Sequence, residues 1–259
     1  MATSRRLRAL ITNDDGIDSP GLHALAGLAV DAGFDVVVAA PHVDTSGVGA
    51  SVSAIRVDGV VRLHPRELPG LDGVPAWAVE GHPAFIVHSA GRGWLDPMPD
   101  VVLSGVNYGA NVGRAVLHSG TVGAALTAGL HGLRALAVSL DSGWAIPERP
   151  HWDAVARVLP EVLEALLSDE PGTVLSLNVP DRAPDALEPL REATLVPFGA
   201  ARIRVEHSEG PDGPVLRASG EPLALAPEEG TDVALLAAGH PTLTRLTQIS
   251  AAPLPLRTR

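Results

Sequence analysis

The chain has 259 residues, of which 46% are hydrophobic, so it is long enough for one large α/β domain with a sizeable core. Its 19 basic and 30 acidic residues give a formal net charge of −11, which argues against non-specific binding to the phosphates of nucleic acids. The chain contains no cysteine, which excludes disulfides and thiolate metal sites.

The N-terminal segment, MATSRRLRAL, is basic, but its apolar run soon reaches Asn13, Asp14 and Asp15, so no signal peptide is expected. The longest apolar stretch, residues 22–40, is interrupted by two aspartates, which argues against a membrane span. We therefore expect a cytoplasmic protein that binds neither a membrane nor a nucleic-acid duplex.

Strand and helix patterns alternate through the first 180 residues. Continuous apolar runs are typical of strands buried on both faces of a parallel sheet, and capped or amphipathic helices lie between them. This alternation predicts a Rossmann-like, doubly wound, mostly parallel α/β sheet. In chain order we expect a strand at 7–12, a helix at 20–33, a strand at 34–41, short strands within 51–65 and at 76–81, a helix at 82–91, a strand at 99–107, a helix at 119–132, a strand at 133–141, a helix at 151–169 and a strand at 173–180.

The pattern changes beyond about residue 185. Residues 201–219 predict a β-hairpin that turns at 210–213, and a short helix and a last strand follow at 230–239 and 242–246. We therefore expect a catalytic core at 1–185 and a C-terminal hairpin extension at 186–259 within the same overall domain. The hairpin is too long to bury its apolar face within its own subunit, so at least a dimer is expected.

Polar residues follow three of the predicted parallel strands. Ligands of open parallel sheets bind beyond the carboxyl ends of the strands, so these residues are expected to meet. Carboxylates, a hydroxyl and an amide carbonyl suit Mg²⁺, Mn²⁺ or Ca²⁺ better than zinc, and such a cation would relieve the repulsion between two adjacent aspartates. The alternative is that the two aspartates only cap the next helix or form a turn. The three clusters are Asn13-Asp14-Asp15, Thr45-Ser46-Gly47 and residues 104–111.

Ser119, Gly120 and Thr121 open the predicted helix at 119–132. Free backbone N–H groups and the helix dipole can bind a phosphate there, and glycine permits a close approach. The alternative is an ordinary Ser/Thr cap. A metal beside an anion site indicates phosphate-ester chemistry.

Four motifs together resemble the SurE (survival protein E) nucleotidase family: NDDGIDSPG, APHVDTSG, PDVVLSGVNYGANVG and SGTVGAA. The resemblance spans about residues 7–180. It implies a phosphatase that acts on nucleoside monophosphates, with a Rossmann-like core and a homodimer or homotetramer that exchanges C-terminal segments. It also implies one divalent cation per subunit, Mg²⁺ or Mn²⁺, at positions that match Asp14, Asp15, Ser46 and Asn107.

The chain departs from the family pattern around the substrate. An Asp-Arg pair is usual where this chain has His42 and Val43, and GHPAFIV, with His82 and Phe85, stands where G-T-P-A-D is common. The family's aspartate and tyrosine before the S-G-T loop are replaced by Ala115 and His118. We expect these changes to affect substrate preference more than phosphatase chemistry.

The expected reaction is metal-assisted hydrolysis of a phosphomonoester. Asn111 and the loop Ser119-Gly120-Thr121 are expected to stabilise the phosphoryl oxygens. His118 is expected to hold the phosphoryl group or protonate the leaving oxygen, or else only to pack against its neighbours. Two other functions stay open: a phosphatase for a sugar phosphate, polyphosphate or other non-nucleotide substrate, and a binding protein that holds a metal and a phosphorylated ligand without turnover.

Overall fold

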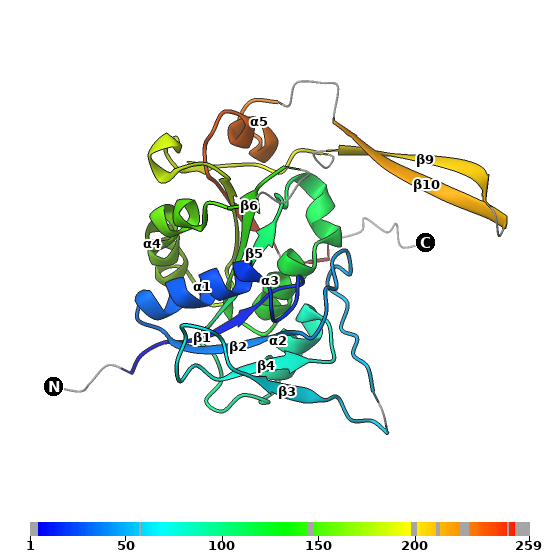
Figure 1. The fold of residues 1–259 in the computed structure, drawn as a ribbon. Helices are drawn as coiled ribbons and strands as arrows, with labels where there is room; N and C mark the ends of the chain where they lie inside the picture. Colours follow the sequence, from blue (N-terminus) through cyan, green and yellow to red (C-terminus); the bar gives the residue numbers. More distant parts are fainter. Residues whose placement is uncertain are drawn as a thin grey trace, which may run out of the picture.

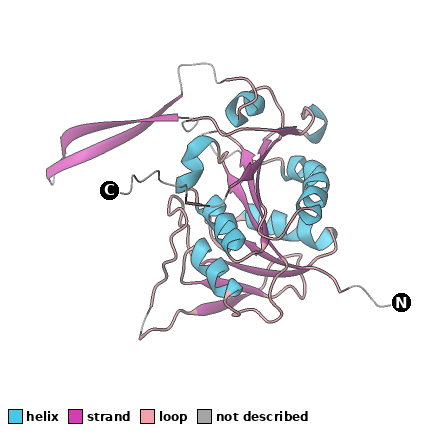
Figure 2. Ribbon diagram, turned by 180° about the vertical axis from the view of Figure 1, so that it is seen from behind, coloured by secondary structure: helices cyan, strands magenta, loops and turns pink. Residues whose placement is uncertain are grey.

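The computed structural model describes residues 5–56, 58–143, 148–197, 201–210, 213–222, 228–247 and 249–251. Within these residues a single large sheet of nine strands forms the centre of the molecule, and helices cover both of its faces (Figures 1 and 2). The strand order is β3-β4-β2-β1-β5-β6-β7-β11-β8. The predicted α/β class with a mostly parallel sheet is confirmed.

Six strands form the parallel part of the sheet, and their order reverses at its middle. From β1 the chain moves outward on one side through β2 and β4, then returns to the other side of β1 for β5, β6 and β7. In doubly wound sheets a reversal of this kind, here between β1 and β5, places a crevice outside the carboxyl ends of the two strands, and ligands bind there. The six strands are β1 (Arg8–Thr12), β2 (Asp35–Pro41), β4 (Ala76–Val79), β5 (Val101–Tyr108), β6 (Arg134–Asp141) and β7 (Val174–Pro180).

Shorter strands complete both edges of this sheet. At one edge β3 (Leu63–Arg66) pairs antiparallel with β4. At the other edge β11 (Thr242–Leu246) pairs antiparallel with β7, and β8 (Arg191–Glu192) pairs parallel with β11. The last strands of the chain thus belong to the same sheet as the core.

Two apolar layers hold the helices to the sheet. Successive side chains of a strand point to opposite faces, so Ile11 packs beneath α1 (Pro20–Asp31) and α4 (Trp152–Ser168) while Leu10 packs beneath α2 (Pro83–Gly91) and α3 (Gly120–Leu130). Leu10 and Ile11 are both fully buried. Of the described helices, none is long and apolar enough to cross a lipid bilayer.

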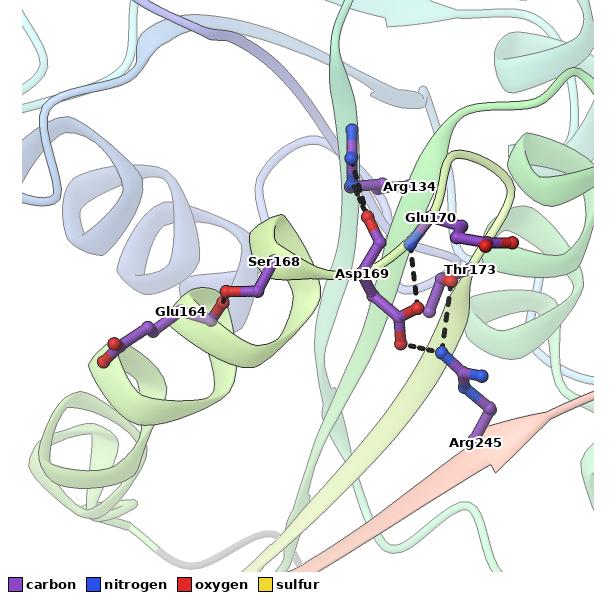
Figure 3. A network of polar contacts seen from close by, with 7 residues as sticks. All are labelled: Arg134, Glu164, Ser168, Asp169, Glu170, Thr173 and Arg245. Carbon is purple, nitrogen blue, oxygen red and sulfur yellow. Dashed lines mark hydrogen bonds and ion pairs between the residues drawn. The ribbon is translucent and has the colours of Figure 1, made fainter.

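A polar network fastens the turn between α4 and β7 at the amino end of the strands, away from the crevice (Figure 3). Arg134 of β6 donates two hydrogen bonds to the carbonyl of Asp169, at 2.9 and 2.7 Å. The Asp169 carboxylate forms an ion pair with Arg245 of β11, whose guanidinium also lies 3.5 Å from the Thr173 hydroxyl. This network links β6 and β11 to the turn that precedes β7, at the end of the sheet opposite the candidate site.

The predicted hairpin is present as an antiparallel ribbon of β9 (Ala201–Gly210) and β10 (Gly213–Pro222). Figure 1 shows it extending away from the body of the molecule. The side chain of Leu216 on β10 is 70% exposed. The short helix α5 (Asp232–Ala237) and two short 3₁₀ helices, η1 (Gly113–His118) and η2 (Pro184–Ala186), complete the described elements.

One predicted strand is mostly wrong. The segment 51–65 was expected to be strand, but only β3 at Leu63–Arg66 forms; apart from an isolated bridge at Ala54, residues 51–56 and 58–62 are loop. The chain turns at Asp58-Gly59, where both residues have positive φ. Val52 and Ile55 remain about half exposed, at 48% and 55%. Strand propensity depends on burial against a packed layer, and these side chains are not buried in this way.

Candidate metal and phosphate site

The loops that follow β1, β2 and β5 meet at the crevice beside the β1–β5 reversal. The backbone N–H of Thr45 donates to the carbonyl of Asp14 at 2.8 Å, which joins the loop after β2 to the loop after β1. The backbone N–H of Gly49 donates to the carbonyl of His118 at 3.2 Å, which joins the same loop to the segment before α3. The fold therefore brings the sequence-predicted clusters to one edge of the sheet.

Asn13 shapes the loop that carries the two aspartates. Its buried amide donates to the carbonyl of Gly16 at 3.1 Å and accepts from the N–H of Gly16 at 3.2 Å. Both polar atoms of the side chain are thus used to close a tight turn. The turn holds Asp14 and Asp15, which lie between these residues, at the carboxyl end of β1.

Asp14 lies against the N-terminus of α3 and is only 3% exposed. The hydroxyl of Thr121 donates to its Oδ1. Burial raises the pKa of Asp14, and the Thr121 hydroxyl and the backbone amides of Thr121 and Gly120 oppose this rise by stabilising the carboxylate. A Cβ at Gly120 would lie 2.6 Å from Asp14 Oδ2, so only glycine permits this approach.

Asp15 carries negative charge that the described side chains leave uncompensated. Its Oδ2 is buried, and no hydrogen-bond partner for it lies among the described residues. Burial, reinforced by the carboxylates of Asp14 and Asp44, raises the pKa of Asp15 from 3.8 to about 7. A buried acceptor without a donor, beside two further acids, is the environment that a cation would stabilise.

Ser46 is exposed, and its hydroxyl is oriented by a neighbour that the sequence analysis missed. Its Oγ donates to Asp44 Oδ1 at 2.6 Å, and its backbone N–H donates to the same oxygen at 2.8 Å. Because the hydroxyl proton is committed to Asp44, the Ser46 oxygen keeps lone pairs with which it can bind a cation. The Asp-x-Ser spacing, typical of an Asx turn, was the available signal.

Asn107, at the end of β5, is fixed in a similar way. Its Nδ2 donates to the carbonyls of Tyr108 and Gly109 at 2.9 and 2.8 Å. Because both partners can only accept, this assigns the amide nitrogen and leaves Oδ1 on the opposite side, free to act as a ligand. The described residues contain no group of three or more His, Asp or Glu side chains placed to hold a metal, so a cation here would also need the neutral oxygens of Ser46 and Asn107.

Asn111 is held by the ends of the next two strands. Its backbone N–H donates to Asn178 Oδ1 at 2.8 Å, its carbonyl accepts from Asn178 Nδ2 at 3.0 Å, and its own Nδ2 donates to the Ser139 hydroxyl at 2.9 Å. Asn178 and Ser139 are buried ends of β7 and β6 that the sequence analysis did not assign to the site. They fix the position of Asn111 at the edge of the crevice.

The S-G-T loop forms the start of α3 as expected. Ser119 caps the helix, and its Oγ accepts from the N–H of Val122 at 3.1 Å. Gly120 and Thr121 are buried and interact with Asp14. The positive end of α3 therefore stabilises a predicted metal ligand, beside the place expected for a phosphate.

His118 ends η1, and its side chain is exposed, as is Ala115. Two other residues that depart from the family pattern are His42, which follows β2, and His82, which lies between β4 and α2. In the strand order, β2 and β4 lie on one side of β1, and the segment with His118 follows β5 on the other side. The metal ligands and the altered positions are thus neighbours at one edge of the sheet.

Comparisons with known proteins show which proteins this chain resembles. The family model described as "Survival protein SurE" matches residues 9–202. The "5'-nucleotidase SurE" of Bradyrhizobium sp. (strain ORS 278) is 35% identical over 246 residues, which cover 93% of each chain. The protein of the same name from Methanopyrus kandleri is 37% identical over 247 residues, 93% of this chain and 91% of the relative. The crystal structure of a SurE protein from Aquifex aeolicus superposes with a TM-score of 0.73 at 30% identity and covers 92% of both chains.

Proposed function

The chain belongs to the survival protein SurE family, and on that premise we propose that it is a divalent-metal-dependent phosphatase that hydrolyses nucleoside monophosphates to nucleoside and phosphate. Curated relatives that match over 93% of this chain are named 5'-nucleotidase, which makes it a phosphoric monoester hydrolase. The observation that carries the proposal is the adjacent pair of buried Asp14 and half-buried Asp15, whose Oδ2 is buried without a partner among the described residues.

Asp14, Asp15, Ser46 and Asn107 would hold one Mg²⁺ or Mn²⁺. The donor set fits such an ion, because it offers two carboxylates, a hydroxyl oriented by Asp44 and an amide oxygen that its own hydrogen bonds leave free. When bound, the ion would polarise a phosphoryl oxygen and lower the pKa of a bound water. Burial raises the pKa of Asp14, and hydrogen bonds from Thr121 and the start of α3 oppose this rise and so favour the charged, ligating form.

Asn111 and the loop Ser119-Gly120-Thr121 are proposed to bind the phosphoryl oxygens. Asn111 is held by Asn178 and Ser139, so its amide needs little reorganisation when charge develops on the substrate. A second hydrogen of its Nδ2 is available for such a contact. The division into a core at 1–185 and an extension at 186–259, and a cytoplasmic location, remain part of the proposal.

His118 is proposed to hold the phosphoryl group or to protonate the leaving oxygen. Its exposed ring precedes α3 directly, and no carboxylate competes at Ala115. If His118 acts in this way, kcat/KM of the wild type falls at pH values above neutrality, and this falling limb is lost in His118→Gln. The measurement is the pH profile of kcat/KM for both proteins. Identical falling limbs would show that His118 only packs against its neighbours.

Assembly into a homodimer or homotetramer is proposed through the ribbon of β9 and β10. An isolated two-stranded ribbon is marginally stable in water, and this one extends from the body with Leu216 exposed (Figure 1). Ala201 pairs with Pro222, so residues 201–222 can be replaced by a short Gly-Ser linker. We expect this deletion to lower the solution mass, measured by light scattering, to that of a monomer. An unchanged mass would exclude the ribbon as the oligomer contact.

Phosphate release from a panel of esters tests the proposed activity. The panel should hold nucleoside monophosphates, a sugar phosphate, polyphosphate and p-nitrophenyl phosphate, each with Mg²⁺ or Mn²⁺ and with EDTA. We expect metal-dependent release that favours nucleoside monophosphates. Preference for the sugar phosphate or polyphosphate would reassign the substrate, and ligand binding without release from any ester would indicate a binding protein.

A further inference from the structure

A pocket of about 180 Å³ lies at the carboxyl ends of β2 and β4. Three segments enclose it: the loop after β2, residues 53–55, and the turn from β4 into α2. The last two are joined by backbone hydrogen bonds, from Ile55 N–H to the Glu80 carbonyl at 2.8 Å and from His82 N–H to the Ser53 carbonyl at 3.0 Å.

This pocket shares a wall with the predicted metal site. Thr45 lines the pocket, and its backbone N–H and its hydroxyl both donate to the carbonyl of Asp14, at 2.8 and 3.2 Å. Ser46 is the next residue along the chain. A group bonded to a phosphate beside Asp14 and Ser46 therefore has this pocket as its neighbouring concavity.

The polar groups of the pocket can bind both hydrogen-bond donors and acceptors. Nδ1 of His82 is buried, and none of the described residues provides it with a hydrogen bond. Oε1 of Glu80 lies 3.0 Å from His64 Nε2, which leaves its second oxygen for a ligand. His42 uses Nδ1 toward the carbonyl of Val79, at 3.3 Å, which leaves Nε2.

The remaining walls are apolar, from Val43, Ala54 and Ile55. Small-molecule sites usually combine such walls with a few placed polar groups. A volume of about 180 Å³ is below the usual range for a whole drug-sized ligand, so the pocket suits a single ring rather than an entire nucleotide. The carboxylate of Glu80 disfavours a second phosphate, because like charges repel.

We propose that this pocket binds the leaving group of the substrate, as an uncharged ring whose edge carries both hydrogen-bond donors and acceptors, such as the base or the sugar of a nucleoside. The proposal rests on the proposed phosphatase function and names the part of the substrate that selects it. His82 and Glu80 then act as specificity-determining residues. His42 and His82 depart from the family pattern, so the side chains that would contact the ring in this chain differ from those usual in the family.

The test compares a ring-bearing ester with one that has no ring. For uridine and adenosine monophosphates and for glycerol 2-phosphate, kcat/KM is measured in the wild type, His82→Ala and Glu80→Gln. Losing a hydrogen bond to a buried polar group typically lowers transition-state binding by about tenfold. We expect the ratio of kcat/KM for nucleotide over glycerol 2-phosphate to fall about tenfold in each variant, chiefly through KM. His88→Ala, at the other end of α2, is the matched control and should keep the wild-type ratio.

Binding of free uridine and adenosine, followed by saturation-transfer NMR, gives a readout without catalysis. We expect signals in the wild type and in His88→Ala that weaken in His82→Ala. An unchanged ratio and unchanged NMR signals in both pocket variants would overturn the proposal, even with full phosphatase activity. Absence of phosphate release from every ester in the wild type would instead contradict the proposed function, and nucleoside binding would then test the pocket by itself.

Discussion

Asp15→Asn is expected to abolish phosphate release and, in the metal-free protein, to raise the melting temperature. The substitution removes a proposed metal ligand charge with little change in volume, so activity should be lost at saturating Mg²⁺ or Mn²⁺. It also removes a carboxylate whose Oδ2 is buried without a partner, next to Asp14 and Asp44. Function and stability therefore place opposite demands on this side chain.

The stability effect has a definite dependence on pH. The pKa of Asp15 is about 7 in the folded chain and 3.8 ordinarily, so the folded protein binds a proton that the unfolded chain has released between these values. Ionised Asp15 therefore destabilises the metal-free protein above pH 7, and protonation relieves this cost as the pH falls toward 4. We expect Asp15→Asn to stabilise by the order of 2 kcal/mol at pH 8 and by much less at pH 5.

Thermal unfolding after EDTA treatment, at both pH values, measures this effect. Asp18→Asn is the matched control, because Asp18 is an exposed acid of the same loop, and it should change neither activity nor melting temperature. Near-wild-type turnover in Asp15→Asn would show that the proposed metal ligands are wrong. EDTA should inactivate the wild type, and Mg²⁺ or Mn²⁺ should restore it; recovery with zinc alone would contradict an all-oxygen site.

The alternation of apolar runs and polar loops was sufficient to predict the sheet and the edge at which the candidate site residues lie. Each buried run ends at a polar cluster, and parallel strands place these clusters together whatever the details of packing. The positions of Asp14, Ser46 and Asn107 at that edge follow from this rule. The hairpin was likewise predictable, because its two strands flank the sequence Gly-Pro-Asp-Gly, whose residue types are typical of turns.

The residues that orient the candidate ligands were not predictable in the same way. Asn178 contacts Asn111 across 67 positions of sequence, and Thr121 contacts Asp14 across 107. Such pairs exist only once the strands are ordered, so no local pattern reveals them. The strand predicted around Val52 was wrong because its local pattern favours a strand, but the side chains there are not buried against a packed layer.

Gly120→Ala is expected to lower activity by about 100-fold, although alanine is the better helix former. The reason is steric: the added Cβ would lie 2.6 Å from Oδ2 and 2.7 Å from Cβ of Asp14, closer than non-bonded atoms approach. Asp14 is buried and bonded to Thr121, so it cannot rotate away freely. Either the carboxylate or the start of α3 must shift, and a shift of about 1 Å is enough to misplace a catalytic group.

Three measurements separate this site-specific clash from a general loss of structure: kcat, Mn²⁺ affinity by calorimetry and melting temperature. We expect the overpacked variant to lose about 1–3 kcal/mol of stability and to bind Mn²⁺ much more weakly while remaining folded. Gly27→Ala is the matched control. Among the described residues outside α1, the new methyl would meet only Leu71 within 4 Å, at 3.9 Å, so all three quantities should stay unchanged or the melting temperature should rise slightly. Wild-type Mn²⁺ affinity and turnover in Gly120→Ala would mean that the close approach of α3 to Asp14 does not position the metal ligand, and the role proposed for the start of α3 would have to be abandoned.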